Sequence, residues 1–394
     1  MAIEEKELFE GKHVLAVEQA LSMPYCTWLL GLKGMDVLRV EPPIGDPNRR
    51  VGNQIGDETH MAYYFLTINN NKKSITLNLK KEEGRKILHE LVEKWPVDIF
   101  CTNQLPSHYK GLGIDYETLS ELNKCIIWAG ISGFGPERPE AAYDPMIQAQ
   151  TGIMYVTGER DRDPMMVGVP IADMMASYAA YTGVMEGLYK LEKLGTGSRH
   201  DISMAQATLA MLAVKLPLEA AGISMIRNGN THNVFAPVST FRTSDGFIMI
   251  AVGNDRQWEA MVKFPGFEVL DRPEYKYNAG RIKNVEKLND EVREITRTKT
   301  TDELIRNFRD VNIPISKVNT VADVIEDPYL EKMTLRTKDP VTGTELILTP
   351  PPETIPYLER DQTFAPRLGE HNKEILEQFL GYDLNKLKTD EIIV

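Results

Sequence analysis

Asp173 is the residue whose type and position best suit covalent chemistry. It follows Gly168–Ala172 and stands directly before Met174–Leu194, an apolar run with the spacing of a long helix. An aspartate at such a position can act as an N-cap, whose carboxylate accepts hydrogen bonds from free backbone N–H groups. It also lies near the positive end of the helix dipole, which favours an ionised carboxylate that can attack an acyl carbon. We therefore consider Asp173 as an N-cap, as a nucleophile, or as both.

Motifs for several other reaction classes are incomplete or absent. The segment Gly130–Phe134 ends on Phe where the G-x-S-x-G turn of serine hydrolases requires Gly. No G-x-x-x-x-G-K-[ST] and no clean G-x-G-x-x-G occurs, so these loops do not support binding of a nucleoside triphosphate or a dinucleotide. The seven histidines and three cysteines show no metal-ligand spacing. We expect no metal site and no permanently bound cofactor.

A fold in which strands and helices alternate must position Asp173. Alternating or continuous apolar residues predict strands, and apolar residues three to four positions apart predict helices. Their alternation over the first 135 residues predicts a mostly parallel, Rossmann-like α/β sheet. The predicted strands are His13–Val17, Asp36–Val40, Ser74–Leu79, Asp98–Thr102 and Cys125–Ile131, and the predicted helices are Leu21–Lys33, Glu82–Lys94, Met174–Leu194 and Met204–Leu218.

Three segments that follow predicted strands are suited to binding a ligand. Glu18–Ser22, Asn103–Pro106 and Ser132–Gly135 carry mainly small and polar residues. Ligands of open α/β sheets bind outside the carboxyl ends of the strands. The sequence therefore predicts a pocket at this edge of the sheet.

Length and charge narrow the possible classes of protein. The chain of 394 residues suggests two or three domains, and its net charge of -12 argues against a nucleic-acid binder. We expect residues 1–222 to begin a large domain, 223–328 to form a smaller α+β domain, and 329–394 to return to the large domain. Residues 1–7 lack a signal-peptide pattern, and no apolar run is long enough to span a membrane. We therefore expect a soluble cytoplasmic protein.

Eight sequence blocks, taken together and in order, are specific. They are Leu8–Leu15, Gly34–Pro43 with Gly45–Arg49, Asn69–Leu79, Ile131–Gly135, Tyr143-Asp144, Gly197–Met204, Asp327-Pro328 and Leu368–His371. In this order and spacing they resemble the class III (CaiB/BaiF-type) CoA-transferases over nearly the whole chain. The resemblance implies a large Rossmann-like domain, a smaller second domain, and an interlaced homodimer or related heteromer.

The resemblance places Asp173 at the nucleophile of that family. It implies that Asp173 attacks an acyl-CoA thioester, giving a mixed anhydride and free CoA thiolate. The thiolate then attacks the aspartyl carbonyl to form an aspartyl-CoA thioester, and a carboxylic acid acceptor takes the CoA by the reverse steps. Coenzyme A and acyl-CoA thus enter as substrates. We consider succinyl-CoA as the donor because it is common in the family, whereas the acceptor cannot be read from the sequence.

The resemblance also assigns binding residues position by position. Leu21 and Tyr143 would face the substrate. Lys80 could bind a phosphate group, but it could equally be a solvated side chain beside Lys81. The positions implied for CoA binding are Ala20, Leu77, Asn78, Lys80, Asn103, Gln104, Leu105, Lys110, Phe134 and Gly135.

Three features depart from the family pattern. Met23-Pro24 replaces the usual Gly-Pro, and Lys110 would substitute for an arginine that falls near Gly111. The glycine-rich loop of formyl-CoA:oxalate enzymes is missing between about residues 235 and 265. Its absence makes oxalate a poor candidate acceptor.

Two alternatives stay open beside a CoA-transferase. The α-methylacyl-CoA racemases or epimerases share the fold but pair an aspartate with a histidine in a Gly-His-Asp block. This chain has Ala142-Tyr143-Asp144 there, and a tyrosine with a pKa near 10 is a poor replacement for an imidazole near pH 7. The second alternative is a non-catalytic subunit of a heteromeric CoA-transferase, although the presence of Asp173 favours an active chain.

Overall fold

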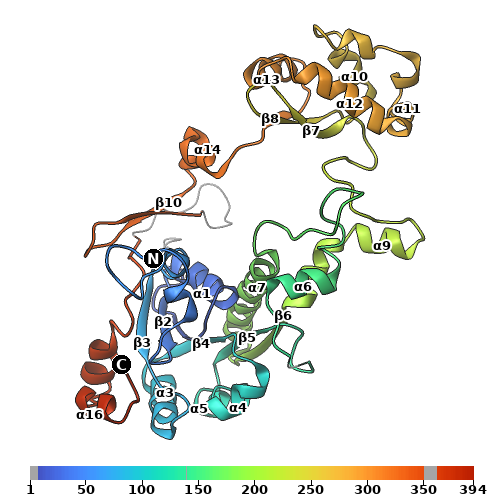
Figure 1. Ribbon diagram of the computed structural model, residues 1–394. Coiled ribbons are helices and arrows are strands. Elements are labelled where there is room, and N and C mark those ends of the chain that lie inside the picture. The colour runs from blue at the N-terminus through green and yellow to red at the C-terminus, as the bar shows by residue number, and fades with distance from the viewer. Residues whose placement is uncertain (1–7, 139, 350–361) are drawn as a thin grey trace. The chain divides into compact units, whose positions relative to one another are not determined.

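The computed structural model describes residues 8–138, 140–349 and 362–394 (Figure 1). Residues 1–7, which the sequence analysis examined for a signal peptide, lie outside these ranges. The chain forms two compact units, one from residues 1–153, 167–217 and 333–394 and the other from residues 154–166 and 218–332. The chain therefore changes units near residues 217 and 332, where the sequence analysis placed boundaries after 222 and 328, and the segment 154–166 belongs to the second unit.

The first unit is built on a six-stranded parallel sheet in the order β3-β2-β1-β4-β5-β6. This arrangement confirms the predicted parallel α/β sheet, and its order is that of a Rossmann-type sheet. The strands are β1 His13–Val17, β2 Asp36–Glu41, β3 Lys72–Thr76, β4 Val97–Thr102, β5 Ile127–Ser132 and β6 Ser198–Ser203.

β3 and β6 differ most from the prediction, and each does so for a physical reason. β3 ends at Thr76, three residues earlier than predicted. Leu77 and Leu79 lie in the following loop but are buried, so the alternation of apolar residues continues past the end of the strand. The sequence analysis missed β6 because its residues Ser-Arg-His-Asp-Ile-Ser are mostly polar, which suits a strand at the edge of a sheet.

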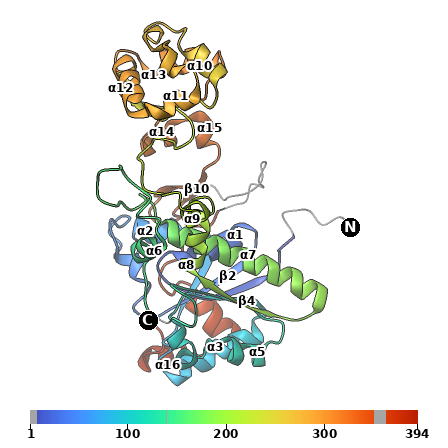
Figure 2. The ribbon, with the colours of Figure 1, turned by 90° about the vertical axis from the view of Figure 1, so that its right-hand side faces the viewer.

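Helices cover both faces of the sheet (Figure 2). Successive β1 side chains point to opposite faces, so Val14 and Ala16 join one core cluster while Leu15 and Val17 join the other. α1 Ser22–Leu32 and α7 Ile171–Leu194 lie on the first face, and α3 Glu82–Lys94, α5 Tyr116–Leu122 and α16 Leu384–Thr389 lie on the second. The sheet is thus packed between two layers of helices, which fix the positions of the loops at its carboxyl edge.

Close packing of α1 and α7 brings their first turns together. Every residue of α1 is buried, and the residues of α7 that face the core are small. At Gly187 a Cβ atom would lie 2.6 Å from Ile127 on β5, so only glycine permits this approach of helix to sheet. α7 ends at Leu194, and the following Gly195 adopts the left-handed conformation that is common after the last residue of a helix.

The remaining helices of the first unit are short. The predicted helix Met204–Leu218 is wrong, because the chain forms α8 Met204–Leu209, a 3-10 turn at Ala210–Leu212 and α9 Lys215–Ala220 instead. The other elements are the 3-10 turns Pro47–Arg50 and Pro106–His108, α2 Tyr63–Leu66, α4 Tyr109–Leu112, α6 Asp144–Thr151, the hairpin of β10 Leu335–Lys338 and β11 Glu345–Leu348, and a π-helix at Lys373–Phe379.

The second unit has its own antiparallel sheet and core. Its strands β7 Val238–Arg242, β8 Phe247–Ala251 and β9 Ile315–Lys317 pair in that order. Its helices are α10 Asp255–Met261, α11 Asn278–Lys283, α12 Val285–Thr296, α13 Thr301–Arg309, α14 Val321–Glu326 and α15 Pro328–Glu331, with 3-10 turns at Glu268–Leu270 and Pro273–Tyr275. Within the ranges that the structure describes, none of the helices of either unit is long and apolar enough to cross a membrane.

Candidate active site

Asp173 is the third residue of α7, not its N-cap. The helix begins at Ile171, and the buried carboxylate of Asp144, at the start of α6, accepts hydrogen bonds from the N–H groups of Ala172 at 2.7 Å and Asp173 at 3.4 Å. Asp144 thus satisfies two of the backbone donors at the start of α7. The N-cap interpretation of Asp173 is wrong for this reason, and the Asp173 carboxyl remains available for other contacts.

The Asp173 carboxyl has an unusual proton affinity for an aspartate. Burial and, secondarily, the negative charge of Asp144 raise its pKa to about 7, while a hydrogen bond from the Ser22 hydroxyl acts in the opposite direction. The carboxyl therefore changes its charge near neutral pH. Perturbed acidic groups of this kind are concentrated at functional sites.

A serine hydroxyl connects α1 and α7 beside Asp173. Ser177 Oγ lies 2.6 Å from the carbonyl oxygen of Ser22 and 2.7 Å from that of Asp173. Both serines are buried. The first turns of the two helices are therefore tied together where the carboxyl lies.

The loops after β1 and β4 meet next to Ser22. The Asn103 side chain accepts a hydrogen bond from Gln19 N at 2.9 Å and donates to Gln19 O at 2.7 Å. Asn103 Nδ2 also lies 3.3 Å from Ser22 Oγ. β1 and β4 are the neighbouring strands at which the order of the sheet reverses, the usual position of a ligand crevice in such folds.

A cavity of about 580 Å³ opens at the carboxyl ends of β1, β2 and β3. This volume is in the range of small-molecule sites. The sequence analysis named the ends of β1, β4 and β5 for the predicted pocket. The ends of β1 and β4 contribute to this cavity and the end of β5 does not, whereas the segments after β2 and β3 and a C-terminal segment contribute as well. The lining residues are Val17, Glu18, Gln19, Val40, Glu41, Pro42, Pro43, Ile44, Leu77, Asn78, Leu79, Lys80, Gln104, Leu112, Lys388, Glu391 and Ile393.

The residues implied for CoA binding fall into two groups around this cavity. Leu77, Asn78, Lys80 and Gln104 line it. The other positions lie in or near loops at the same edge of the sheet but are not part of the lining: Ala20, Asn103, Leu105, Lys110, Phe134 and Gly135. The loop after β5, which contains the last two of these, therefore does not contribute to this cavity.

The two implied substrate residues have different surroundings. Leu21 is partly buried and packs, together with Met174 and Tyr178 of α7, against an apolar cluster that includes Tyr25 of α1. Tyr143 is 72% exposed. The structure thus places Leu21 between α1 and α7, whereas Tyr143 projects outward at the start of α6.

The loop after β1 has a constrained backbone. Ala20 has φ of 61°, a left-handed conformation that is unfavourable for a residue with a Cβ atom. The Asp46 carboxylate accepts its N–H at 3.2 Å, and Asn48 donates to its carbonyl oxygen at 2.9 Å. These contacts hold the strained residue beside the cavity, and strain of this kind is typical of binding sites.

A balanced group of buried charges supports this loop. Lys72 donates to Glu18 at 3.0 Å, Arg39 to Asp46 at 2.8 Å and Arg49 to Glu41 at 2.6 Å. All six side chains are buried. Each buried charge needs a partner, so these pairs fix the segments after β1 and β2 relative to each other.

The sequence analysis missed the C-terminal contribution to the cavity. Asn78 N–H donates to Ile392 O at 2.8 Å, and Lys81 Nζ bonds Glu391 at 2.8 Å. Val394 N–H donates to Thr76 Oγ1 at 3.2 Å. No local sequence signal indicates these contacts, because the partners lie as many as 318 positions apart.

Exposed lysines at the cavity could receive anionic groups. Lys80 and Lys388 are exposed lining residues, and neither forms an ion pair with any residue in the described ranges. In the same ranges, no three His, Cys, Asp or Glu side chains are grouped as metal ligands. The cavity is therefore suited to an organic anion with apolar parts.

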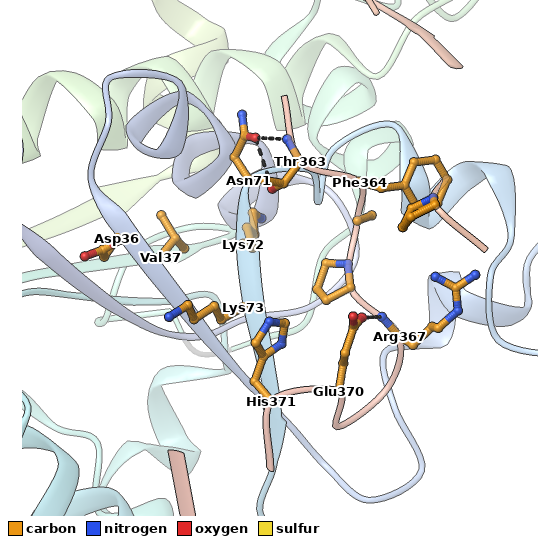
Figure 3. A pocket seen from close by; sticks show the side chains of 13 residues that line it. Asp36, Val37, Asn71, Lys72, Lys73, Thr363, Phe364, Arg367, Glu370 and His371 are labelled. Carbon is orange, nitrogen blue, oxygen red and sulfur yellow. Dashed lines mark hydrogen bonds between the residues drawn. The ribbon is translucent and has the colours of Figure 1, made fainter. Parts of the chain in front are cut away.

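A separate cavity of about 360 Å³ lies at the other ends of β2 and β3 (Figure 3). Asp36, Lys73 and His371 are among its lining residues. Its cationic side chains are paired, since Lys73 bonds Glu374 at 2.6 Å and Arg367 bonds Asp339 at 2.9 Å. We assign it no part in the chemistry.

Comparisons with known proteins agree with one another. The family model described as CoA-transferase family III matches residues 9–372. The chain is 29% identical to human succinyl-CoA:glutarate CoA-transferase, over 95% of this chain and 86% of the relative. It is 30% identical to an acetyl-CoA:oxalate CoA-transferase from Acetobacter aceti, over 94% and 95%. A solved CaiB/BaiF family protein from Brucella suis has a TM-score of 0.84 and 31% identity, covering 94% of this chain and 99% of that chain.

Proposed function

The chain belongs to CoA-transferase family III, and we propose that it moves CoA from an acyl-CoA donor to a carboxylic acid through covalent intermediates on Asp173. The observation that supports this role best is the Asp173 carboxyl itself. It is partly buried at the start of a helix, close to the carboxyl edge of the sheet, and burial with the charge of Asp144 raises its pKa to about 7. A carboxylate in a largely dry site is a stronger nucleophile than one in water.

The proposed reaction consists of four attacks without water. An Asp173 oxygen attacks the thioester carbonyl, its C–S bond breaks, and a mixed anhydride and CoA thiolate result. The thiolate attacks the aspartyl carbonyl and displaces the donor acid, leaving an aspartyl-CoA thioester. The acceptor carboxylate then attacks this thioester and releases the thiolate. The thiolate finally attacks the acceptor carbonyl, which forms the new acyl-CoA and regenerates Asp173.

We propose that the 580 Å³ cavity holds CoA. Leu77 and Leu79 offer an apolar surface there, and Lys80 and Lys388 offer positive charge for phosphate groups. For the donor we propose succinyl-CoA and for the acceptor a dicarboxylic acid other than oxalate, in keeping with the name of the succinyl-CoA:glutarate relative. Oxalate, which the name of the Acetobacter aceti relative contains, belongs in the substrate screen as the test of that exclusion.

We also propose that the active form is an interlaced homodimer or a related heteromer. Large apolar side chains are exposed on the first unit around α6 and α8, as expected for a surface that another subunit covers. They include Tyr143, Met146, Leu209, Met211 and Val214. Sedimentation of the isolated chain together with its activity would distinguish a self-sufficient dimer from a chain that needs a different partner.

A labelling experiment tests the covalent route directly. In the proposed sequence, the donor acid leaves with an oxygen of Asp173, and the acceptor acid replaces that oxygen. With an ¹⁸O-labelled acceptor, label should therefore appear in the released donor acid over repeated turnovers. A donor–acceptor screen by mass spectrometry would first identify the pair, and hydroxylamine trapping would map the acylated residue.

Variants complete the test of the proposed nucleophile. Asp173→Ala should abolish transfer and trapping while CoA binding persists, and exposed Asp57→Ala serves as the control. Acylation of a different residue, or transfer at the normal rate by Asp173→Ala, would disprove the proposal. Exchange of the α-proton of an α-methylacyl-CoA with solvent deuterium, without acyl transfer, would instead identify a racemase.

A further inference from the structure

The polar side chains that line the proposed CoA cavity fall into two groups. Four of them already form hydrogen bonds or ion pairs within the protein: Glu18, Glu41, Asn78 and Glu391. The side chains of the other four form none with any residue in the described ranges: Gln19, Lys80, Gln104 and Lys388. These four side chains are therefore the ones left to bind a ligand.

The two glutamines are held by their backbones at neighbouring strand ends. Gln19 follows β1, and its N–H and carbonyl oxygen both bond the Asn103 side chain, at 2.9 Å and 2.7 Å. Gln104 follows β4, and its N–H donates at 3.2 Å to Thr102 Oγ1, which itself donates to Val17 O at 2.8 Å. Because β1 and β4 are adjacent in the sheet, the two side-chain amides extend from one rigid base.

The two lysines lie at the opposite end of the cavity. Lys80 is in the loop after β3, and Lys388 is in α16. The segment after α16 bonds that loop, since Asn78 N–H donates to Ile392 O at 2.8 Å. In the sheet order β3-β2-β1-β4, three strand spacings of about 4.8 Å each separate β3 from β4. Positive charge and amide groups thus occupy two different ends, the lysine end and the glutamine end, of one cavity.

The glutamine end adjoins the first turns of α1 and α7. Asn103, which bonds Gln19 and precedes Gln104, has its Nδ2 3.3 Å from Ser22 Oγ in α1. Ser177 Oγ bonds the carbonyl oxygens of both Ser22 and Asp173, at 2.6 Å and 2.7 Å. The order along this edge of the sheet is therefore the lysines, the glutamines and then Asp173.

CoA carries its own groups in a matching order. Its phosphates lie at the nucleotide end, its two secondary amides lie in the pantetheine arm, and its sulfur ends that arm. We propose that Gln19 and Gln104 bind the amides of the pantetheine arm and thereby direct the thioester toward Asp173. The phosphates then lie at the lysine end. This inference rests on the proposed binding of CoA in the cavity.

The chemistry of the two partners is complementary. A secondary amide has one N–H donor and one C=O acceptor, and a glutamine side chain offers an acceptor and donors in return. The rest of the lining is apolar or already engaged, apart from the lysines. An amide placed against it would lose its hydrogen bonds to water without replacement. Because only two methylene groups separate the last amide from the sulfur, pairing with the glutamines also fixes where the sulfur lies.

Binding of CoA and of adenosine 3′,5′-bisphosphate tests this assignment without turnover. The bisphosphate keeps the nucleotide end of CoA but has no pantetheine arm. Methionine matches the length of glutamine and lacks the amide. In titration calorimetry of the full chain, Gln19→Met combined with Gln104→Met should weaken CoA binding about tenfold, for the loss of neutral hydrogen bonds, and leave bisphosphate binding unchanged. Lys388→Gln should weaken the binding of both ligands by a similar factor.

Gln378→Met is the matched control. Gln378 is exposed in the π-helix of the same unit and lies outside the cavity lining, so neither affinity should change. If the double glutamine variant binds CoA normally while Lys388→Gln does not, the inference falls alone. Equal weakening of both ligands by the glutamine substitutions would overturn it too. CoA binding that neither substitution affects, or no CoA binding at all, would overturn the proposed cavity as well.

Side-chain amide signals give a readout that altered folding would not imitate. In protein labelled with ¹⁵N-glutamine, the signals of Gln19 and Gln104 are assigned by their loss in the single methionine variants. Both signals should shift when CoA is added and neither when the bisphosphate is added, and the Gln378 signal should shift with neither ligand. Shifts caused by the bisphosphate, or none caused by CoA, would refute the orientation.

Discussion

The Asp144 carboxylate accepts the backbone N–H of Asp173 at 3.4 Å. One side chain thereby has two effects on the other. Its hydrogen bonds hold the first turn of α7 in place, whereas its negative charge makes ionisation of Asp173 less favourable. The arrangement stabilises the helix that carries the proposed nucleophile and keeps the proton affinity of that nucleophile high.

Neutralising Asp144 should shift the pH dependence of transfer. In the unmodified enzyme the rate should rise with pH through about 7, because the pKa of Asp173 is raised to about 7 and only the ionised form attacks. Asp144→Asn removes the charge but keeps an oxygen for the α7 N–H groups, so the acid limb of kcat/KM should move to lower pH. If the acid limb of kcat/KM does not move in Asp144→Asn, burial alone raises the pKa of Asp173.

The helix contact itself can be tested with a shorter side chain. Asp144→Ala removes the acceptor for the α7 N–H groups and should lower the free energy of unfolding by about 1–2 kcal/mol. Asp144→Asn should lower it less. Urea unfolding of the two variants at one pH would separate the hydrogen bonds from the charge.

Ionisation of Asp173 should lower the free energy of unfolding at neutral and alkaline pH. Its pKa in the folded protein is about 7, above the ordinary value of 3.8. The folded state therefore binds the proton more tightly than the unfolded state, and stability falls as the pH rises from about 4 through 7. Asp173→Asn should raise the free energy of unfolding by about 2 kcal/mol at pH 8 and have little effect at pH 4. Urea unfolding at the two pH values checks the sign, and a destabilised variant at pH 8 would refute it.

Lys388 should contribute to binding of the CoA donor. Lys388→Gln removes a positive charge from the cavity, so KM should rise roughly fivefold with little change in kcat, for a contribution of about 1 kcal/mol. The effect should weaken as salt is added. Lys386→Gln is the matched control, since Lys386 lies on the same helix but not in the cavity lining. Equal effects of the two substitutions would argue against a direct contact.

The folded protein should be more stable with glycine in place of Ala20. Its φ of 61° is unfavourable for an alanine, so Ala20→Gly should raise the free energy of unfolding by about 0.5–1 kcal/mol. Ala20→Val should lower it, because a β-branched side chain fits this conformation worst. Denaturant unfolding of the pair gives the comparison, and the opposite order would show that the loop relaxes to another conformation.

Local sequence patterns were sufficient to predict most strands of the six-stranded sheet. β1 and α3 have the predicted bounds, because turn residues and clear periodicity mark both ends of each. The alternation of Leu77 and Leu79 extended β3 too far, since burial continues where strand pairing stops. The polar edge strand β6 has no apolar pattern to detect.

The candidate site was predictable only in part. Asp173 stands out by its position before an apolar run, and the resemblance named several cavity residues. Asp144 was not predicted as a partner of Asp173, because this contact depends on the packing of α6 against α7. Such contacts join residues far apart in the chain and have no local sequence pattern.

Residues 388–393 complete a wall of the cavity whose other walls come from strands near the beginning of the chain; Lys81 and Glu391, which join across it, are 310 positions apart. During synthesis, β1 to β3 leave the ribosome long before this wall exists. The cavity is therefore complete only after residues 388–393 have been translated.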